Sequence, residues 1–311
     1  MFLEIIMWFK NLLLFRFTKP FEYSAEELAE KLADYSFEPC GSQDLQAYGW
    51  VPPLGRAGTD LVHAAGGYIM LCARRQEKLL PAAVVNEVVE DQVAAIEAEQ
   101  GRPVRRKERT SLKEEAMFSM LPKAFNRSTL QYAYIAVQEG LLVVNAASST
   151  RAEEMMDCLR STLGSLPVVP LGVKGDPIVR MTSWLKDGGL PAGFSFGHEC
   201  ELRDALDESG VIRARHQDLS SEDINRHVQG GMVVTKLGLQ WQDRLDCVID
   251  EKLGIKKLVF SDIVQEKSQS GEADDIAAQF DIDFSIMTLE LKAFVDALVA
   301  GFGGEDVVEA E

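Results

Sequence analysis

The segment that decides the fold is Pro81-AAVVNEVVEDQVAAIEAEQGRPVRRKERTSLKEEAMFSML-Pro122. Proline is well placed at the start of a helix, and the apolar residues that follow at helical spacing are Val85, Val88, Val89 and Ile96. Gly101-Arg-Pro103 should break this first helix, and a second is predicted from Val104 to Leu121, where Pro122 stops it. The segment therefore predicts a helical hairpin that projects from the rest of the chain.

The turn and second helix of this hairpin carry a concentrated positive charge. From Arg102 to Lys113 there are six basic residues and one acidic residue, a local balance of +5 in a chain of net charge −17. Clustered Lys and Arg near a helix are typical of phosphate contacts, although a solvated helix face is the alternative. The segment from Ser261 to Glu311 has a net charge of −11, which could repel DNA from that part of the surface or serve only solubility.

The remaining patterns predict an α+β fold, with antiparallel sheets, packed helices and the projecting hairpin. Strands are expected over residues 8–17, 68–73, 130–137, 141–147, 168–173, 211–215, 232–240, 245–250 and 255–260. Helices are expected after the capping box Ser24-x-x-Glu27, from Ser148 or Ser149 to Leu163, after Ser220 or Ser221, and over 283–302. We expect residues 40–58 to be a loop, 175–197 to be irregular, and the acidic residues from Gly303 onward to be disordered.

Composition indicates a cytoplasmic globular protein. The chain has 311 residues, of which 46% are hydrophobic and 26% charged. Its five scattered cysteines favour a reducing compartment over a disulfide framework. No apolar run reaches the roughly twenty residues of a membrane span, and the apolar N-terminus lacks the basic start of a signal peptide.

The sequence contains no recognisable catalytic, metal or cofactor motif. A P-loop, a dinucleotide fingerprint, Cys-x-x-Cys and His-Glu-x-x-His are all absent. The spacing in His198-Glu-Cys200 is poor for a metal site, since alternate residues of a strand face opposite sides. The acidic residues that could be imagined to bind magnesium in a nuclease are Asp274, Asp275, Asp281 and Asp283, but no basic residues surround them to hold a substrate.

Phe125 is the aromatic residue most expected to be exposed. It follows the helix-breaking Pro122 and lies between Lys123 and Arg127. An exposed Phe flanked by cations is typical of an interface anchor or of a platform on which bases stack.

Several short motifs, in this order along the chain, resemble the bacterial RdgC family of recombination-associated proteins. They are Trp8-Phe-Lys-Asn-Leu12, Pro39-Cys-Gly-Ser-Gln-Asp44, Gly49-Trp-Val-Pro-Pro53, Cys72-Ala-Arg74, Leu121-Pro-Lys-Ala-Phe125, Leu163-Gly-Ser-Leu-Pro-Val168 and Gln217-Asp-Leu219, with Lys236-Leu237 and Trp241. The resemblance covers about residues 7–304, and residues 1–6 have no counterpart.

The resemblance implies a horseshoe-shaped subunit that pairs head to head into a ring-shaped homodimer around double-stranded DNA. Such a protein is not an enzyme, is nucleoid-associated, binds DNA with little sequence preference (single strands more weakly), and antagonises RecA-driven strand exchange in recombination and at replication forks. The implied dimer interface comprises a gate at Phe125 and a hinge at Arg215, His216 and Gln217. His216 stands where Lys or Arg is usual, and Gly101-Arg-Pro103 replaces a more helical stretch.

These considerations give a set of expected DNA-binding residues: Arg74, Arg75, Lys78, Arg102, Arg105, Arg106, Lys107, Arg109, Lys113, Lys123 and Arg127. The expected domains are a central one (1–80 and 126–174), a helical finger (81–125), a C-terminal α+β domain (175–303) and an acidic tail (304–311). Two other functions remain open, namely a metal-dependent DNA-processing enzyme such as a nuclease, and an acidic adaptor that binds RecA directly.

Overall fold

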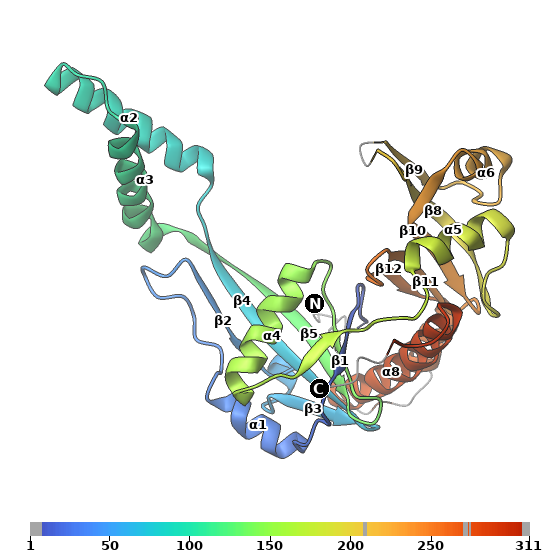
Figure 1. The fold of residues 1–311 in the computed structure, drawn as a ribbon. Coiled ribbons are helices and arrows are strands. Elements are labelled where there is room, and N and C mark those ends of the chain that lie inside the picture. Colours follow the sequence, from blue (N-terminus) through green and yellow to red (C-terminus); the bar gives the residue numbers. More distant parts are fainter. Residues whose placement is uncertain (1–7, 208–209, 270–272, 274, 307–311) are drawn as a thin grey trace. The chain divides into compact units, whose positions relative to one another are not determined.

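A computed structural model describes residues 8–207, 210–269, 273 and 275–306 (Figure 1). The chain forms two compact units. The larger unit comprises Met1–Lys31, Pro52–Cys72 and Tyr132–Glu311, and the smaller unit comprises Leu32–Val51 and Ala73–Gln131. The protein is mixed α and β, and both sheets contain antiparallel strand pairs, as the sequence predicts. The four-part domain division stays a prediction.

The first sheet has the strand order β2-β4-β5-β6-β1-β7, with β3 also paired to β4. Its members are β1 (Leu13–Phe17), β2 (Gln46–Trp50), β3 (Val62–Ala65), β4 (Tyr68–Leu79), β5 (Phe125–Ala136), β6 (Leu141–Val144) and β7 (Val168–Pro170). In the larger unit, β1 lies between β6 and β7, and the side chains of Leu12, Leu14 and Phe17 in this segment are buried. Helix α4 (Ser149–Leu163) begins after Ser148 and ends at Gly164, whose φ of 77° is the left-handed conformation that glycine tolerates.

The second sheet lies wholly within the larger unit and has the order β12-β11-β10-β8-β9. The strands are β8 (Phe194–Asp204), β9 (Val211–Arg215), β10 (Met232–Trp241), β11 (Leu245–Asp250) and β12 (Ile255–Phe260). The antiparallel sheet predicted for β10, β11 and β12 is confirmed. Strand β8, which pairs with both β9 and β10, is not among the predicted strands, and its first residues lie in the stretch expected to be irregular.

The prediction that residues 175–197 are irregular is wrong. Helix α5 (Pro177–Asp187) occupies the middle of this stretch, and the Asp176 carboxylate caps it by accepting a bond of 3.0 Å from the backbone N–H of Val179. Pro177 sits at the first helical position, and Gly188 ends the helix with a φ of 72°. The proline and glycine therefore mark the two ends of a helix rather than an irregular segment.

Helices and aromatic rings cover one face of the second sheet. Helices α5 and α6 (Glu222–Gln229) pack on β10, as Figure 1 shows. Helix α7 (Asp262–Gln269) packs on α8 (Ile276–Gly301), and Phe294 of α8 lies 6.0 Å from the ring of Phe194 and 5.8 Å from that of Trp241. Helix α8 begins seven residues before the predicted start at Asp283, since Asp275 caps it through the backbone N–H of Ala278 at 2.8 Å.

The smaller unit contains β2, which corrects the expected loop over residues 40–58. Residues Gln46 to Trp50 pair with Glu77 to Ala73 on β4, and a short 3-10 helix, η1 (Gly55–Ala57), follows in the larger unit. Ahead of β2, helix α1 (Ala25–Ala33) begins with the predicted capping box. The Glu27 N–H donates to the Ser24 hydroxyl at 3.1 Å and the Ser24 N–H donates to the Glu27 carboxylate at 2.8 Å.

The predicted helical hairpin is confirmed. It consists of α2 (Ala82–Gln100) and α3 (Arg106–Met120), and Gly101 ends α2 with a φ of 64°. The two helices share a small core of Val85, Val89, Val93 and Ala116. A 3-10 turn, η2 (Leu121–Lys123), then leads into β5, which starts at Phe125 rather than at Leu130.

The prediction of disorder from Gly303 onward is wrong for Gly303 to Asp306, and 307–311 lie outside the described residues. The Asp306 N–H donates to the Gly172 carbonyl at 3.0 Å, and the Lys174 N–H donates to the Gly304 carbonyl at 3.0 Å. Both Glu305 carboxylate oxygens accept hydrogen bonds from the Arg16 guanidinium at 2.6 Å. Sequence composition could not reveal this ion pair, because its partners lie at opposite ends of the chain.

Glu305→Gln is predicted to destabilise the folded protein. The paired side chains are only 26% and 22% exposed, so loss of the bidentate ion pair should lower the free energy of unfolding by about 1 kcal/mol. Urea denaturation measures this difference, with Glu153→Gln on the exposed surface of α4 as the matched control. Equal midpoints for both variants would contradict the structural role of Glu305.

Candidate nucleic-acid interface

Positive charge is unevenly divided between the two units. All eleven predicted DNA-binding cations lie in the smaller unit, which holds eleven Lys and Arg against twelve Asp and Glu, a net charge of −1. The larger unit carries the other −16 of the chain's −17. Basic residues are therefore balanced most nearly by acidic ones in the smaller unit, which is the unit more suited to contact an anion.

Two cations near the hairpin turn form ion pairs within the hairpin and stabilise it. Arg102 makes a bidentate ion pair with Glu108, with N–O distances of 2.8 and 2.9 Å. The hydrogen bond from Arg102 holds the pKa of the Glu108 carboxyl below its ordinary value. Arg109 of α3 is ion-paired with Glu90 of α2, so it joins the two helices. These two guanidiniums have part of their charge neutralised inside the hairpin.

Four further cations of the hairpin remain exposed and without an ion pair among the residues that the structure describes: Arg105, Arg106, Lys107 and Lys113. Arg106 and Lys113 lie on the same side of α3 as Arg109, because seven residues make about two helical turns. With Asn86 of α2 and Thr110 they line a shallow pocket of about 210 Å³. This side of the hairpin can receive a phosphate group.

The predicted DNA-binding arginines on the strands already contact other side chains of the protein, unlike the four unpaired hairpin cations. Arg74 lies over the ring of Phe37 at 5.1 Å. Glu77 accepts ion pairs from Arg75 and, at 2.6 Å, from Arg127. Lys78 is half-buried, whereas Lys123 is exposed. We therefore expect Arg74, Arg75 and Arg127 to contribute less to anion binding than the unpaired hairpin cations.

The dimer-interface residues that the family resemblance implies are divided between the two units. Phe125 is 83% exposed at the start of β5, in the smaller unit, so it is not a core residue. Arg215, His216 and Gln217 are exposed at the end of β9, in the larger unit. There the Gln217 N–H donates to the His198 carbonyl at 3.2 Å. Their roles in pairing two subunits stay predictions.

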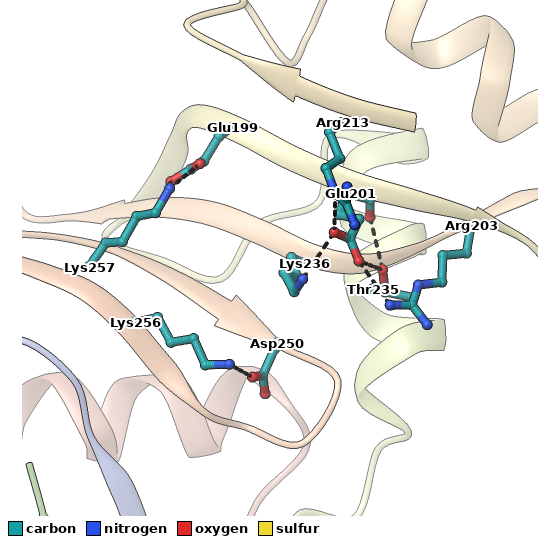
Figure 2. A network of polar contacts seen from close by, with 9 residues as sticks. All are labelled: Glu199, Glu201, Arg203, Arg213, Thr235, Lys236, Asp250, Lys256 and Lys257. Carbon is teal, nitrogen blue, oxygen red and sulfur yellow. Dashed lines mark hydrogen bonds and ion pairs between the residues drawn. The ribbon is translucent and has the colours of Figure 1, made fainter. Parts of the chain in front are cut away.

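A second basic surface, which sequence reasoning missed, lies on one face of the second sheet (Figure 2). Charges alternate in sign along a row that crosses all five strands: Arg213, Glu201, Lys236, Asp250 and Lys256. The first four are paired across adjacent strands, and Lys256 forms an ion pair with Asp250 at 2.9 Å. We call this row the charge ladder. Side chains that face each other across antiparallel strands lie on the same side of the sheet. Within the row, Arg213 and Lys236 also form ion pairs with Glu201.

Glu201 is the centre of the charge ladder and the most buried of its charges. It is 4% exposed and accepts hydrogen bonds from Arg213 at 2.8 Å, Lys236 at 3.0 Å and Arg203 at 3.1 Å. Burial alone would raise the pKa of the Glu201 carboxyl. The hydrogen bonds from these three cations outweigh burial and lower the pKa to about 2. Three cations are thus fixed by one carboxylate, which leaves a local excess of positive charge.

The sequence did contain a signal for this surface. Glu199, Glu201 and Arg203 alternate along β8, as do Arg213 and Arg215 along β9, and charges at every second residue predict one polar face of a sheet. What sequence could not supply was the register that places Arg213 and Lys236 on either side of Glu201.

The acidic residues considered for a magnesium site are not brought together as ligands. Asp275 caps α8, and Oδ1 of Asp281 lies 3.2 Å from Nε2 of His63. Asp283 accepts hydrogen bonds from Ser268 and Gln279. Asp274 lies outside the described residues. Within the described part of the chain, no three His, Cys, Asp or Glu residues cluster as metal ligands, and no helix is long and apolar enough to cross a membrane.

Comparison with known proteins gives the family. A family model described as "Putative exonuclease, RdgC" matches residues 7–305. The chain belongs to the RdgC family. The Recombination-associated protein RdgC of Aeromonas hydrophila is 45% identical over 300 residues, covering 96% of this chain and 99% of that protein. The proteins of the same name from Psychromonas ingrahamii and Proteus mirabilis are 44% and 41% identical, with the same coverage.

Glu201→Gln is predicted to destabilise the protein in a pH-dependent way. Because the folded-state pKa of Glu201 is below its unfolded value, its ionised form stabilises the fold above pH 4.5, and this contribution is lost as pH falls towards 2. The variant should therefore lose roughly 3 kcal/mol at pH 7.

The measurement is the urea midpoint of both proteins at pH 7 and at intervals down to pH 2. The difference should shrink across the window from pH 4.5 to 2, and exposed Glu266→Gln serves as control. A difference that is independent of pH would show that the carboxylate charge is not what matters.

Proposed function

We propose that this protein is a non-catalytic, sequence-independent double-stranded DNA-binding protein. In this proposal two subunits close into a ring around the duplex, and the bound ring antagonises RecA-mediated strand exchange during recombination and replication-fork repair. Membership of a family whose curated members are named recombination-associated supports a role in recombination. The observation that carries DNA binding is the group of four unpaired, exposed cations on the hairpin of an otherwise acidic protein.

Sequence independence follows from the kind of contact that these residues can make. Lys and Arg on the surface of a helix contact phosphates, which carry no base identity, and their binding free energy comes largely from counterion release. Arg106 and Lys113 flank a pocket with Thr110 and Asn86, whose side chains can also donate to phosphate oxygens. Single-stranded DNA has a lower charge density and should bind more weakly.

Closure into a horseshoe-based ring is proposed from the family resemblance together with exposure. The gate is assigned to Phe125, since an aromatic side chain that is 83% exposed is typical of an interface anchor. The hinge is assigned to Arg215, His216 and Gln217 at the exposed end of β9. A ring that holds DNA without base contacts would stay bound through topology rather than affinity alone, and this would make the protein nucleoid-associated.

The non-catalytic part of the proposal differs from the family model's description as an exonuclease. We favour binding because the curated relatives are named for recombination. Degradation of linear duplex DNA by the purified protein with magnesium would contradict this part of the proposal. It would leave the assignment of the DNA-binding cations untouched.

Neutralising three of the unpaired hairpin cations should weaken DNA binding without regard to sequence. In the variant Arg105→Gln, Arg106→Gln and Lys107→Gln, the slope of log K against log salt should fall by about 0.9 for each phosphate that the protein no longer neutralises. Fluorescence anisotropy with two unrelated duplexes at several salt concentrations measures this slope. The control triple replaces Arg160, Lys186 and Arg226, exposed cations of the acidic larger unit, and should keep the wild-type slope.

Phe125→Ala should weaken the gate but not the hinge. Loss of an anchoring aromatic costs on the order of 2 kcal/mol at an interface, so the variant should remain dimeric yet release circular duplex DNA faster and inhibit RecA less. Phe118→Ala is the matched control, since Phe118 is also exposed, at 61%, but lies on α3. Wild-type retention on circular DNA would exclude the gate role, and a selective loss of single-strand binding would indicate base stacking instead.

A further inference from the structure

A hollow lies in the polar face of the second sheet, beside the charge ladder. It has a volume of about 640 Å³, within the range of small-molecule sites, and its lining comes entirely from β8, β10, β11, β12 and the end of β9. The whole hollow therefore belongs to the larger unit.

Two glycines keep the floor of this hollow free of side chains. A Cβ on Gly238 of β10 would lie 2.8 Å from the backbone oxygen of Glu199, and a Cβ on Gly197 of β8 would lie 3.0 Å from the carbonyl carbon of Gly238. The strands approach each other so closely here that neither position accepts another residue without a backbone shift. The pairing of β10 with β8 also shifts register beside Gly238, between Leu237 and Leu239.

Lys257 spans the hollow from the opposite edge of the sheet. Its ammonium lies 2.5 and 2.7 Å from the two carboxylate oxygens of Glu199 (Figure 2). Strands β12 and β8 are separated by two others, which is about 14 Å in a flat sheet. The contact therefore requires a strongly bent sheet, and the irregular pairing of β10 with β8 and of β11 with β12 supplies that bend.

The backbone at Lys257 is strained. The register shift between Asp246 and Val248 leaves Lys257 as the extra residue on β12, with a φ of 52°, a conformation usually taken by glycine at such a bulge. His216, on the rim of the same hollow, has a φ of 53°. Two non-glycine residues in the left-handed region at one hollow are the type of strain that functional sites retain.

In the single subunit, Arg215 is available to a ligand. It lies directly across from Glu199 in the strand register, but Glu199 is taken by Lys257, and Arg215 is exposed with no ion pair among the described residues. His198 and His216 lie beside it on the same rim. The other wall is formed by Gln240 and the exposed Asp246, which can accept hydrogen bonds from amino groups.

We propose that this hollow binds a nucleotide with a terminal phosphate, either free or at the 5′ end of a DNA strand. The phosphate lies between Arg215 and Lys257, assisted by the two imidazoles, and displaces the Glu199 carboxylate from the ammonium. The base extends over the glycine floor and its amino group donates a hydrogen bond to Asp246 or Gln240. The side chains of Lys257 and Glu199 are 61% and 25% exposed, and a partly exposed ion pair of this kind is weak, so a dianionic phosphate can replace one of its partners.

The site shares Arg215 and His216 with the proposed hinge, so a ligand bound here competes with the hinge contacts of these side chains. Its test uses the protein without duplex DNA. Calorimetric titrations with adenosine 5′-monophosphate, a 5′-phosphorylated tetranucleotide, the same tetranucleotide with a 5′-hydroxyl, and inorganic phosphate separate the sources. We expect binding of at least one 5′-phosphorylated ligand in preference to the 5′-hydroxyl tetranucleotide and to inorganic phosphate. Equal binding of all four ligands, or none at millimolar concentration, would overturn the proposal.

Three variants of the larger unit test the assignment of residues. Arg215→Gln should weaken nucleotide binding roughly tenfold, the effect of removing one charge-assisted hydrogen bond. Glu199→Gln should strengthen binding several-fold, because it removes the carboxylate that competes for Lys257. Arg226→Gln on α6, an exposed arginine outside the hollow, should have no effect.

Lys257→Gly separates the ligand role of this residue from a structural one. Glycine adopts a positive φ without strain, so the variant should unfold at the wild-type temperature or above, while nucleotide binding falls roughly tenfold. Sedimentation of each variant shows whether the subunits still associate, which distinguishes damage to the hollow from damage to a hinge at Arg215. Wild-type affinity in both Lys257→Gly and Arg215→Gln would overturn the proposal.

Discussion

The pairing of each cation with a carboxylate, or the lack of one, decides which positive charges of this protein can act on an outside anion. The chain has 49 acidic and 32 basic residues, and many of its cations form ion pairs with carboxylates. Arg102 and Arg109 are held inside the hairpin, and Arg213 and Lys236 are held by Glu201. An ion pair of this kind fixes the geometry of an exposed surface but reduces its attraction for phosphate.

The cations without such a partner are therefore the ones that can bind an external anion. Arg105, Arg106, Lys107 and Lys113 gather at the start of one helix and along it, and the partner helix contributes Asn86 and Glu90 to the same pocket. Arg215 is free for a different reason, because Lys257 occupies the carboxylate opposite it. The four hairpin cations lie on an exposed helix surface and suit a long polyanion, whereas Arg215 lies at a hollow and suits a compact ligand.

Local sequence signals predicted local structure well. Ser24 with Glu27, Gly101 and Gly164 all begin or end helices as their chemistry requires, and the three strands expected at β10 to β12 are correct. The errors arose where distant residues decide the outcome. Composition suggested disorder at Glu305, yet Arg16 binds it from the far end of the chain, and the register of β8 that centres three cations on Glu201 depends on long-range pairing. The basic cluster of the hairpin was visible in the sequence, but which of its cations are already neutralised was not.

The protein is proposed to hold duplex DNA by enclosing it. The most direct measurement compares retention of the protein on covalently closed circular DNA and on the same DNA linearised, in sedimentation at a salt concentration that weakens phosphate contacts. Enclosure predicts that the protein remains with the circle and is lost from the linear form through its free ends. Equal loss from both forms would contradict enclosure and would indicate that the protein binds DNA only through phosphate contacts on its surface.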